Sequence, residues 1–493
     1  MMDHPDLTTT KPVKPLDASI VFLGTCSMRP SPTRNVSGNA IRIGREWTIV
    51  DCGEGTQHQI LKCASHPTCS RISPGNITRI LITHLHGDHC FGLPGLMCLI
   101  DNAVAAMVKD PSTRTTNGDG SNSSASKRKR TKCPKESIDD GGDDDYGGQD
   151  SNENVVHIVG PRGLRNMIRA ILLSSCTGIS FRFRVDELWT ERDVRQHQGM
   201  QQQSSNGGAH FATVFGLANH PSEIAGVDVL PNSDSTWTIP THPAGGPMAA
   251  SWKMFAAPLQ HTIDSVGYVF VEGPQRGTLN VTQALRDRLL TDENKVYQKT
   301  MGVSNPLQLL GFLQKGESAS IKEGGIIVEL NPGEYVSPPA PGRKLVVLGD
   351  TCDSRRLAGL AANADMIVHE ATNAAIEEGE TRDAVLRLAV SRGHSTPEMA
   401  GAFAQACGAK QLVLTHFSSR YKGDESAESV AIMNQIVKQA TETFGGKSVL
   451  AAKDLMEIKL ISQKGARDMV DPSKALEDSA AAADAYLRRA GFM

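Results

Sequence analysis

The segment of residues 83–89, directly after the apolar run at 80–82, constrains the fold more than any other part of this chain. It holds three imidazoles and one carboxylate, the side chains of His84, His86, Asp88 and His89. Side chains two positions apart at the end of a strand project to the same side, so the first two histidines can hold one ion. The chain turns at Gly87, and the remaining two donors face a second position. Neutral imidazole and carboxylate together suit a divalent metal of the zinc type.

A polar loop with several unrelated histidines is the alternative interpretation of this segment. The strand before it and the glycine-rich stretch at 91–96 after it favour the metal site. A site for two metals needs more donors, and His261, Asp350 and His416 each follow an apolar, strand-like run. Sites in α/β folds gather at the carboxyl ends of strands. Any one of these three residues alone would more often be structural, but together they predict a binuclear metal site.

Length and composition narrow the class of protein. A chain of 493 residues can bury a large core, and 39% hydrophobic residues indicate a globular protein. No apolar run approaches the roughly 18 residues needed to span a membrane, and the N-terminus has no features of a signal or transit peptide. Ten cysteines without a CxxC spacing predict reduced thiols. We therefore expect a cytoplasmic or nuclear protein; the net charge of −3 neither indicates nor excludes a nucleic-acid partner.

Strand-like runs alternate with helical segments along most of the chain, for example at 18–23, 47–50 and 80–82. This alternation predicts an α/β fold with sheets inside and helices outside. Residues 110–154 break the pattern, because they carry too few apolar side chains to offset the entropy of ordering, and we expect them to be disordered. The basic run at 127–132 within them is open to two interpretations, a nuclear import signal or a solvated charge run.

A second polar region, roughly 190–250, is interpreted as a variable surface insertion. Its histidines lack strand ends and convergent acids, so we do not expect them to contact the metals: His210, His220 and His242. The Ala-rich residues 463–493 predict a helical tail without evident chemistry.

Several sequence blocks follow one another in an order that is typical of one family. They are Leu23-Gly24-Thr25, Pro30 to Ser37, Asp51 to Gln57, His86 to His89 running into Gly92 to Leu96, Gly349-Asp350-Thr351, His369 to Thr372, Gly393-His394-Ser395 and Thr415 to Tyr421. On these blocks the chain resembles the metallo-β-lactamase superfamily, and within it the tRNA 3′-processing endonucleases called ribonuclease Z or tRNase Z. The resemblance covers about 18–462 apart from the insertions. It implies an αββα sandwich.

The resemblance also implies a role for each site residue. One Zn²⁺ would bind His84, His86 and His261, and the other would bind Asp88, His89 and His416. Asp350 would bridge the two ions of each subunit. Mn²⁺ or another divalent metal could replace zinc in vitro. Asp88 would also orient the attacking water as general base.

His394 would protonate the leaving 3′ oxygen. Glu370 either orients that histidine or caps a helix as a buried carboxylate, and His369 is expected to pack in the core. The candidates for substrate binding are Arg34, Ser37, Ser418, Arg420 and Tyr421; the last four either contact phosphate or support the site.

The family grips its substrate through a protruding arm between the His261 and Asp350 blocks, here roughly 280–335. The glycine and proline content expected before this segment is thin, which departs from the family pattern. The implied partner is precursor tRNA. With one set of ligands and no duplicated half, the chain resembles the short form of the family, which implies a homodimer.

The predicted function is therefore removal of the 3′ trailer from precursor tRNA, leaving a 3′ hydroxyl ready for CCA addition. Two alternatives belong to other classes. A hydrolase of a small phosphodiester, thioester or sulfate ester would share the metals on the same fold, but the blocks around Arg34, His394 and Tyr421 favour the nuclease. A non-catalytic RNA-binding or scaffolding protein would be expected to have lost ligands, and all seven are present.

Overall fold

The computed structural model describes residues 16–109, 155–204, 217–242, 244–275, 277–461 and 469–492. The segment 110–154 with its basic run at 127–132, and also His210, lie outside the described residues, so the expectations for them stay expectations.

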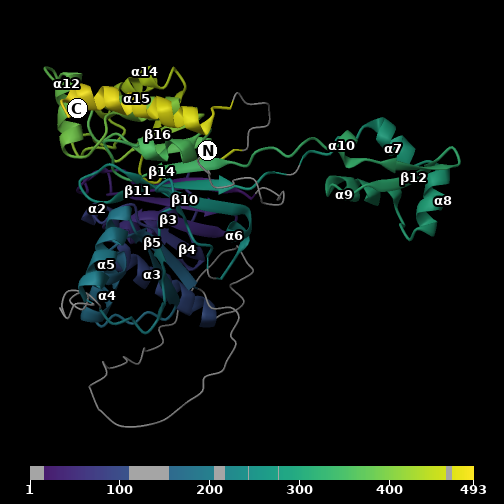
Figure 1. The fold of residues 1–493 in the computed structure, drawn as a ribbon, viewed down its shortest axis with the longest axis horizontal. Helices are drawn as coiled ribbons and strands as arrows, with labels where there is room; N and C mark the ends of the chain where they lie inside the picture. Colours follow the sequence, from purple (N-terminus) through teal and green to yellow (C-terminus); the bar gives the residue numbers. More distant parts are fainter. Residues whose placement is uncertain are drawn as a thin grey trace, which may run out of the picture.

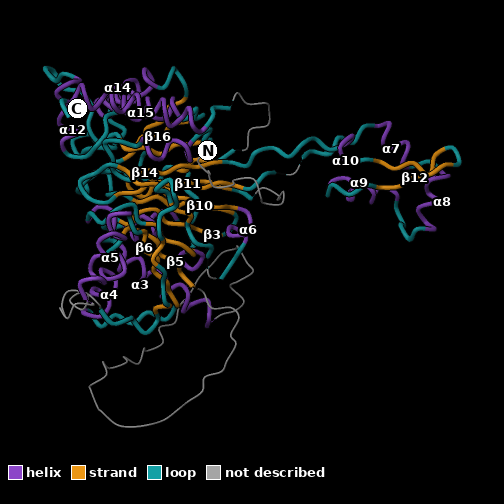
Figure 2. The backbone as a smooth tube through the Cα atoms, viewed as in Figure 1, coloured by secondary structure: helices purple, strands orange, loops and turns teal. Residues whose placement is uncertain are grey.

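Two mixed β-sheets form the centre of the described molecule (Figures 1 and 2). The first has nine strands among the described residues, in the order β18-β1-β2-β3-β4-β5-β6-β7, with β8 paired to β6. Its pairs are antiparallel from β18 to β3 and parallel from β3 onward. The bounds are β1 Ala18–Gly24, β2 Gly38–Ile43, β3 Glu46–Cys52, β4 Ile77–Leu81, β5 Val155–Pro161, β6 Arg182–Leu188, β7 Glu223–Ile224, β8 Asp228–Val229 and β18 Glu457–Lys459.

The second sheet has seven described strands in the order β17-β16-β15-β14-β11-β10-β9. It is parallel from β14 to β17 and antiparallel from β9 to β14. The bounds are β9 Trp237–Thr238, β10 Trp252–Leu259, β11 Ser265–Glu272, β14 Lys344–Leu348, β15 Met366–Glu370, β16 Gln411–Thr415 and β17 Ser448–Ala451.

Three apolar layers hold the sandwich together. The central layer fills the space between the sheets with side chains such as Phe22, Val50 and Tyr268, all fully buried. The outer layers join each sheet to its helices, so the order is αββα as the resemblance implied. On the first sheet these helices are α1 Thr56–Cys63, α3 Leu93–Lys109 and α4 Leu164–Ser174; on the second they are α11 Ala358–Ala361, α13 Pro397–Ala406 and α14 Ala427–Thr443.

The Ala-rich tail forms the helix α15, Pro472–Ala490. It packs against α11, α12 (Arg382–Ser391) and α13, so it lies on the outer helical layer of the second sheet. An ion pair of 2.8 Å between Arg355 and Asp484 joins it to the loop that follows Asp350.

The described part of the 190–250 segment is built into both sheets, which corrects its interpretation as a surface insertion. After α5 (Glu191–Ser204), strands β7 and β8 extend the first sheet, and β9 adds an edge to the second with Trp237 fully buried. His220 and His242 are buried and hydrogen-bond to backbone carbonyls, His220 to Thr177 and His242 to both Thr78 and Val155. A strand of two residues is too short to show the alternation of apolar and polar side chains by which strands are recognised in a sequence.

Residues 279–336 form a separate lobe, called here the arm lobe, which protrudes from one edge of the sandwich (Figure 1). Two antiparallel bridges, Gln275 with Ala340 and Leu279 with Val336, form its stalk. Its own small core includes Leu285, Leu313 and Ile321, all fully buried. Its elements are α7 Gln283–Leu289, α8 Asp292–Thr300, α9 Leu309–Gln314, β12 Ala319–Glu323, β13 Ile326–Leu330 and α10 Pro332–Tyr335.

One stretch of the described residues, Gly87–Ala106, is long and apolar enough by length and composition alone to cross a membrane. It spans α2 (Gly87–Cys90) and α3, and it includes Asp88 and His89 of the candidate site. Leu93, Leu96 and Ile100 of this stretch pack into the core beneath the first sheet. Buried core helices commonly have this length and this apolar composition.

Candidate metal centre

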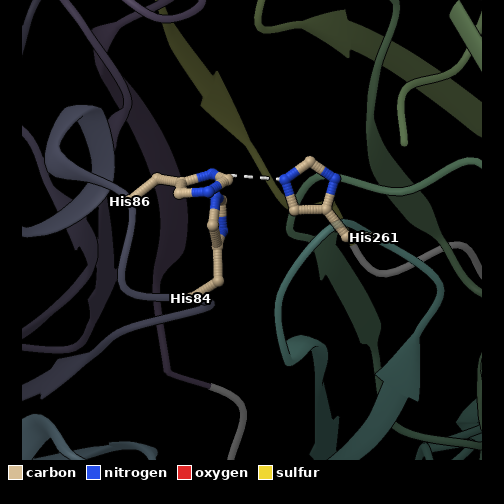
Figure 3. A group of neighbouring side chains, drawn as sticks. All are labelled: His84, His86 and His261. Atoms are coloured by element: carbon tan, nitrogen blue, oxygen red, sulfur yellow. Dashed lines mark hydrogen bonds between the residues drawn. The ribbon is translucent and has the colours of Figure 1, made fainter. Parts of the chain in front are cut away.

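His84, His86 and His261 converge beyond the ends of strands from the two sheets (Figure 3). The first two lie in the loop after β4, and His261 follows β10. The ring centroids are 4.9 to 5.1 Å apart in each pair, and His261 Nε2 lies 3.3 Å from His86 Nδ1. His261 Nδ1 lies 2.7 Å from the carbonyl oxygen of Gly393, so this ring nitrogen donates to the backbone and leaves Nε2 for a metal.

A second group, Asp88, His89 and His416, adjoins the first. His89 Nε2 lies 3.1 Å from His416 Nε2 and 3.6 Å from Asp88 Oδ2. Asp350, at the end of β14, lies between the groups: its carboxylate oxygens are 3.8 Å from His84 Nε2, 3.4 Å from His89 Nε2 and 3.3 Å from His416 Nδ1. The structure therefore brings all seven predicted donors into one cluster with Asp350 shared.

The donor atoms fit divalent cations. His84 is fully buried, and its Nε2 has no hydrogen-bond partner among the described residues. Burial also lowers its pKa well below the usual value, so the ring is neutral and offers a lone pair. The Nε2 atoms of His89 and His416 face the same space, 3.1 Å apart. A buried polar atom without a partner is costly, and a bound cation satisfies it.

Asp51 is a functional residue that the sequence interpretation missed, although it belongs to one of the family-like blocks. Its carboxylate lies 2.7 Å from His89 Nδ1 and accepts hydrogen bonds from the backbone N–H and hydroxyl of Thr83. Asp51 is buried with a left-handed φ of 62°, at the end of β3. Such a carboxylate fixes the ring orientation of a metal-binding histidine. In the sequence, Asp51 could have been recognised as an acidic residue at the end of an apolar, strand-like run.

His394 and Glu370 form a pair beside Asp350. His394 Nδ1 lies 3.1 Å from a Glu370 oxygen and 3.7 Å from Asp350 Oδ2. Burial lowers the pKa of His394, but the adjacent Glu370 carboxylate outweighs this effect and raises it to about 9. Glu370 is buried and also accepts hydrogen bonds from the Thr351 N–H and the Thr372 hydroxyl. These partners favour the orienting role over the helix cap.

His369 lies in the core, as expected. Its Nε2 is 3.0 Å from the Ser354 hydroxyl, and its Nδ1 donates to the backbone carbonyl of Glu370.

The predicted substrate-binding residues separate into buried and accessible sets. Arg34 is only 2% exposed, donates to Thr25 and to the backbone carbonyls of Tyr421 and Ala452, and stacks over Phe417. The Tyr421 hydroxyl is buried against Ala374, and Ser37 is buried near Asp51. Burial favours the supporting role for Ser37 and Tyr421 and corrects the predicted substrate contact of Arg34: the three hold the loops around the site together.

Ser418 is partly exposed and Arg420 is exposed. Arg420 pairs with Glu380 at 2.6 Å. Arg29, which the sequence interpretation did not single out, is exposed, and its side chain reaches Ser419 at 3.4 Å.

Two mixed sheets face to face, with histidines and aspartates clustered at their strand ends, define a metal-dependent hydrolase of the metallo-β-lactamase superfamily, whose family model matches residues 33–167. Zinc phosphodiesterase ELAC protein 1 of Bos taurus is 32% identical over 454 residues, 91% of this chain and 100% of the relative. Ribonuclease Z of Bacillus cereus (strain G9842) is 30% identical over 435 residues, 87% of this chain and 95% of the relative. The chain belongs to the ribonuclease Z family.

A solved structure, the short form of human tRNase Z, is 26% identical with a TM-score of 0.48, covering 90% of this chain and 100% of that one.

Proposed function

We propose that this protein is an endoribonuclease that cleaves the 3′ trailer from precursor tRNA and leaves a 3′ hydroxyl on the tRNA. The observation that carries the proposal is the complete cluster of seven donors in a chain of the ribonuclease Z family. We expect it to act in the cytoplasm or nucleus, in keeping with the free thiols of its described cysteines.

Two Zn²⁺ ions per subunit fit the two groups of donors. His84, His86 and His261 would hold one ion, and Asp88, His89 and His416 the other, with the Asp350 carboxylate between them. When bound, the ions lower the pKa of a water molecule toward neutrality and neutralise charge on the phosphate during in-line displacement.

Asp88 and His394 would move the protons of the reaction. One oxygen of Asp88 accepts a 2.6 Å hydrogen bond from the Met28 N–H, which fixes the carboxylate where it can take a proton from the attacking water. On the other side of Asp350, His394 would give a proton to the leaving 3′ oxygen as the phosphorus–oxygen bond breaks. The buried Glu370 holds the ring of His394 in place and favours its protonated form.

Substrate contacts would come from the accessible residues around the cluster and from the arm lobe. Arg29 and Arg420 are exposed, Ser418 is partly exposed, and all three would suit phosphate oxygens. The arm lobe would bind the tRNA away from the cleavage site, and in a homodimer one subunit's arm would present tRNA to the site of the other. Light scattering of the purified protein tests the dimer.

Cleavage of an unprocessed precursor tRNA tests the proposed function. With zinc or manganese present, the full chain should cut just after the discriminator base and leave a 3′ hydroxyl. Asp88→Ala should lower the rate on the order of 10³-fold or more, because it removes both a metal ligand and the base. Asp478→Ala, on the outer surface of α15, is the matched control and should cleave normally. A wild type that leaves the precursor intact but hydrolyses small esters well would favour the small-molecule hydrolase instead.

A further inference from the structure

Two of the most exposed large apolar side chains among the described residues lie beside the candidate metal centre. Met28 is 75% exposed and Phe91 is 68% exposed. Single exposed apolar residues are common on protein surfaces. These two differ because each contacts the segment of Gly87 and Asp88, where the donors of the second metal group begin.

Phe91 is fixed to the metal loop by its position after α2. It retains right-handed helical geometry, so it lies on the same side of the helix as Gly87 and Asp88, four and three residues earlier. Its ring lies directly against Gly87, where an added Cβ atom would be 2.4 Å from ring atom Cε2. The glycine thus leaves room for the ring, most of which remains exposed to solvent.

Met28 is held on the Asp88 carboxylate by its own backbone. Its φ of 64° is a left-handed conformation that non-glycine residues seldom adopt. This conformation aims its N–H at Asp88 Oδ2 at 2.6 Å, while Ser27 before it donates to the carbonyl of Phe417. The strained backbone therefore fixes the methionine in place and leaves its side chain exposed at the metal centre.

We propose that Met28 and Phe91 form a nucleobase-binding subsite that holds the unpaired bases flanking the scissile phosphate. This inference rests on the proposed function. A phosphate at the metals places the adjoining nucleotides beside Asp88, where the two side chains stand. An aromatic ring stacks on any base, and a methionine thioether packs against aromatic rings. Neither group reads hydrogen-bond patterns, which suits an enzyme that must accept the differing discriminator and trailer bases of many tRNAs.

Kinetics on intact and abasic precursors test the subsite in the full-length, metal-loaded protein. Three precursor tRNAs are compared: one intact, one abasic at the discriminator position and one abasic at the first trailer nucleotide. Phe91→Ala and Met28→Ala should each lower kcat/KM on the intact precursor about 10- to 100-fold. One abasic precursor lacks the base that the substituted side chain would contact. On that precursor, kcat/KM of each variant should lie within about twofold of wild type.

Conservative variants and a surface control separate stacking from a structural role. Phe91→Trp and Met28→Leu should keep most of the activity, because they preserve an aromatic or apolar surface. Leu61→Ala, on α1 and 54% exposed, should behave as wild type on all three precursors. Metal content and melting temperature should not change in any of these variants.

Equal losses on intact and abasic precursors, or no loss on either, would overturn the subsite while the wild type still cleaves. A wild type that leaves the intact precursor uncut would instead overturn the proposed function, and the subsite with it.

Discussion

The candidate metal centre draws its donors from separate segments between His84 and His416, whereas the arm lobe is one continuous piece of chain, residues 279–336. In the centre, buried hydrogen bonds fix individual rings, such as those from His89 to the Asp51 carboxylate and from His261 to the Gly393 carbonyl. The arm lobe has its own small core and joins the sandwich through its stalk. The metal centre and the arm lobe are therefore physically separate, and so would be the chemistry and the substrate capture proposed for them.

The arm lobe lacks the excess of positive charge that is expected of an arm that binds phosphates. Its basic residues are matched by at least as many acids: Arg286, Arg288, Lys295, Lys299, Lys315 and Lys322 against Asp287, Asp292, Glu293, Glu317, Glu323, Glu329 and Glu334. Arg288 pairs with Glu323 at 3.0 Å, and Lys295 pairs with Asp292 at 2.8 Å. Exposed apolar side chains stand among them, including Ile326 and Ile327 of β13. Binding by the arm should consequently depend only weakly on salt.

Removing the arm lobe is the most severe test of this separation. Leu279 and Val336 are bridge partners, so a short Gly–Ser turn can replace residues 280–335 without moving the stalk. We expect kcat/KM on precursor tRNA to fall about 100-fold or more, because binding energy remote from the reacting phosphate is lost. Hydrolysis of a small phosphodiester should stay within about twofold of wild type. An equal loss on both substrates would show that the arm also supports the metal centre.

The reverse test weakens the centre and leaves the arm untouched. Asp51→Asn should lower metal affinity about 10- to 100-fold, because it removes the carboxylate that orients His89. Metal content after dialysis against a weak chelator measures the effect. Asp186→Asn is a matched control, since Asp186 makes the same buried 2.7 Å contact to a histidine, His157, away from the metal donors. Loss of metal in the control as well would mean that general destabilisation, not ring orientation, is responsible.

The same contrast explains what could be predicted from the sequence. The donors could be found because each directly follows an apolar strand, a local pattern, and the sandwich order followed from the family-like blocks. The roles of Arg34 and Tyr421 could not be predicted, because a polar residue in a loop gives no local sign of burial. Arg34 is buried by contacts with Ala452 and Phe417, hundreds of residues away in the chain.

The 190–250 segment was misinterpreted for a related reason. Its polar composition indicated a surface position, but His242 is buried against Val155, far away in sequence, and Trp237 is buried in the core between the sheets. Composition averages over a segment, whereas burial is decided residue by residue through tertiary contacts.

The smallest predicted effect is a change in the free energy of unfolding with pH. It is expected in the sandwich and not in the arm lobe, because the segment 280–335 contains no histidine. Burial, together with the nearby Arg79 guanidinium, lowers the pKa of His242 to about 4. Between its ordinary pKa near 6.5 and this value, the unfolded chain binds a proton that the folded chain does not. The free energy of unfolding should therefore fall as pH drops through this window, by roughly 1–3 kcal/mol in total at pH 4.

Urea unfolding of wild type and His242→Gln at several pH values between 7 and 4 measures this contribution. Glutamine keeps an N–H donor for the carbonyls of Thr78 and Val155 but cannot take up a proton, so the variant should lose less stability on acidification than wild type. Amide exchange in the core of the arm lobe should show no matching change between pH 6.5 and 5 once corrected for the intrinsic exchange rate. Identical pH slopes in the two proteins would assign the acid sensitivity to other groups, and a matching change in the arm would mean that the two regions unfold as one unit.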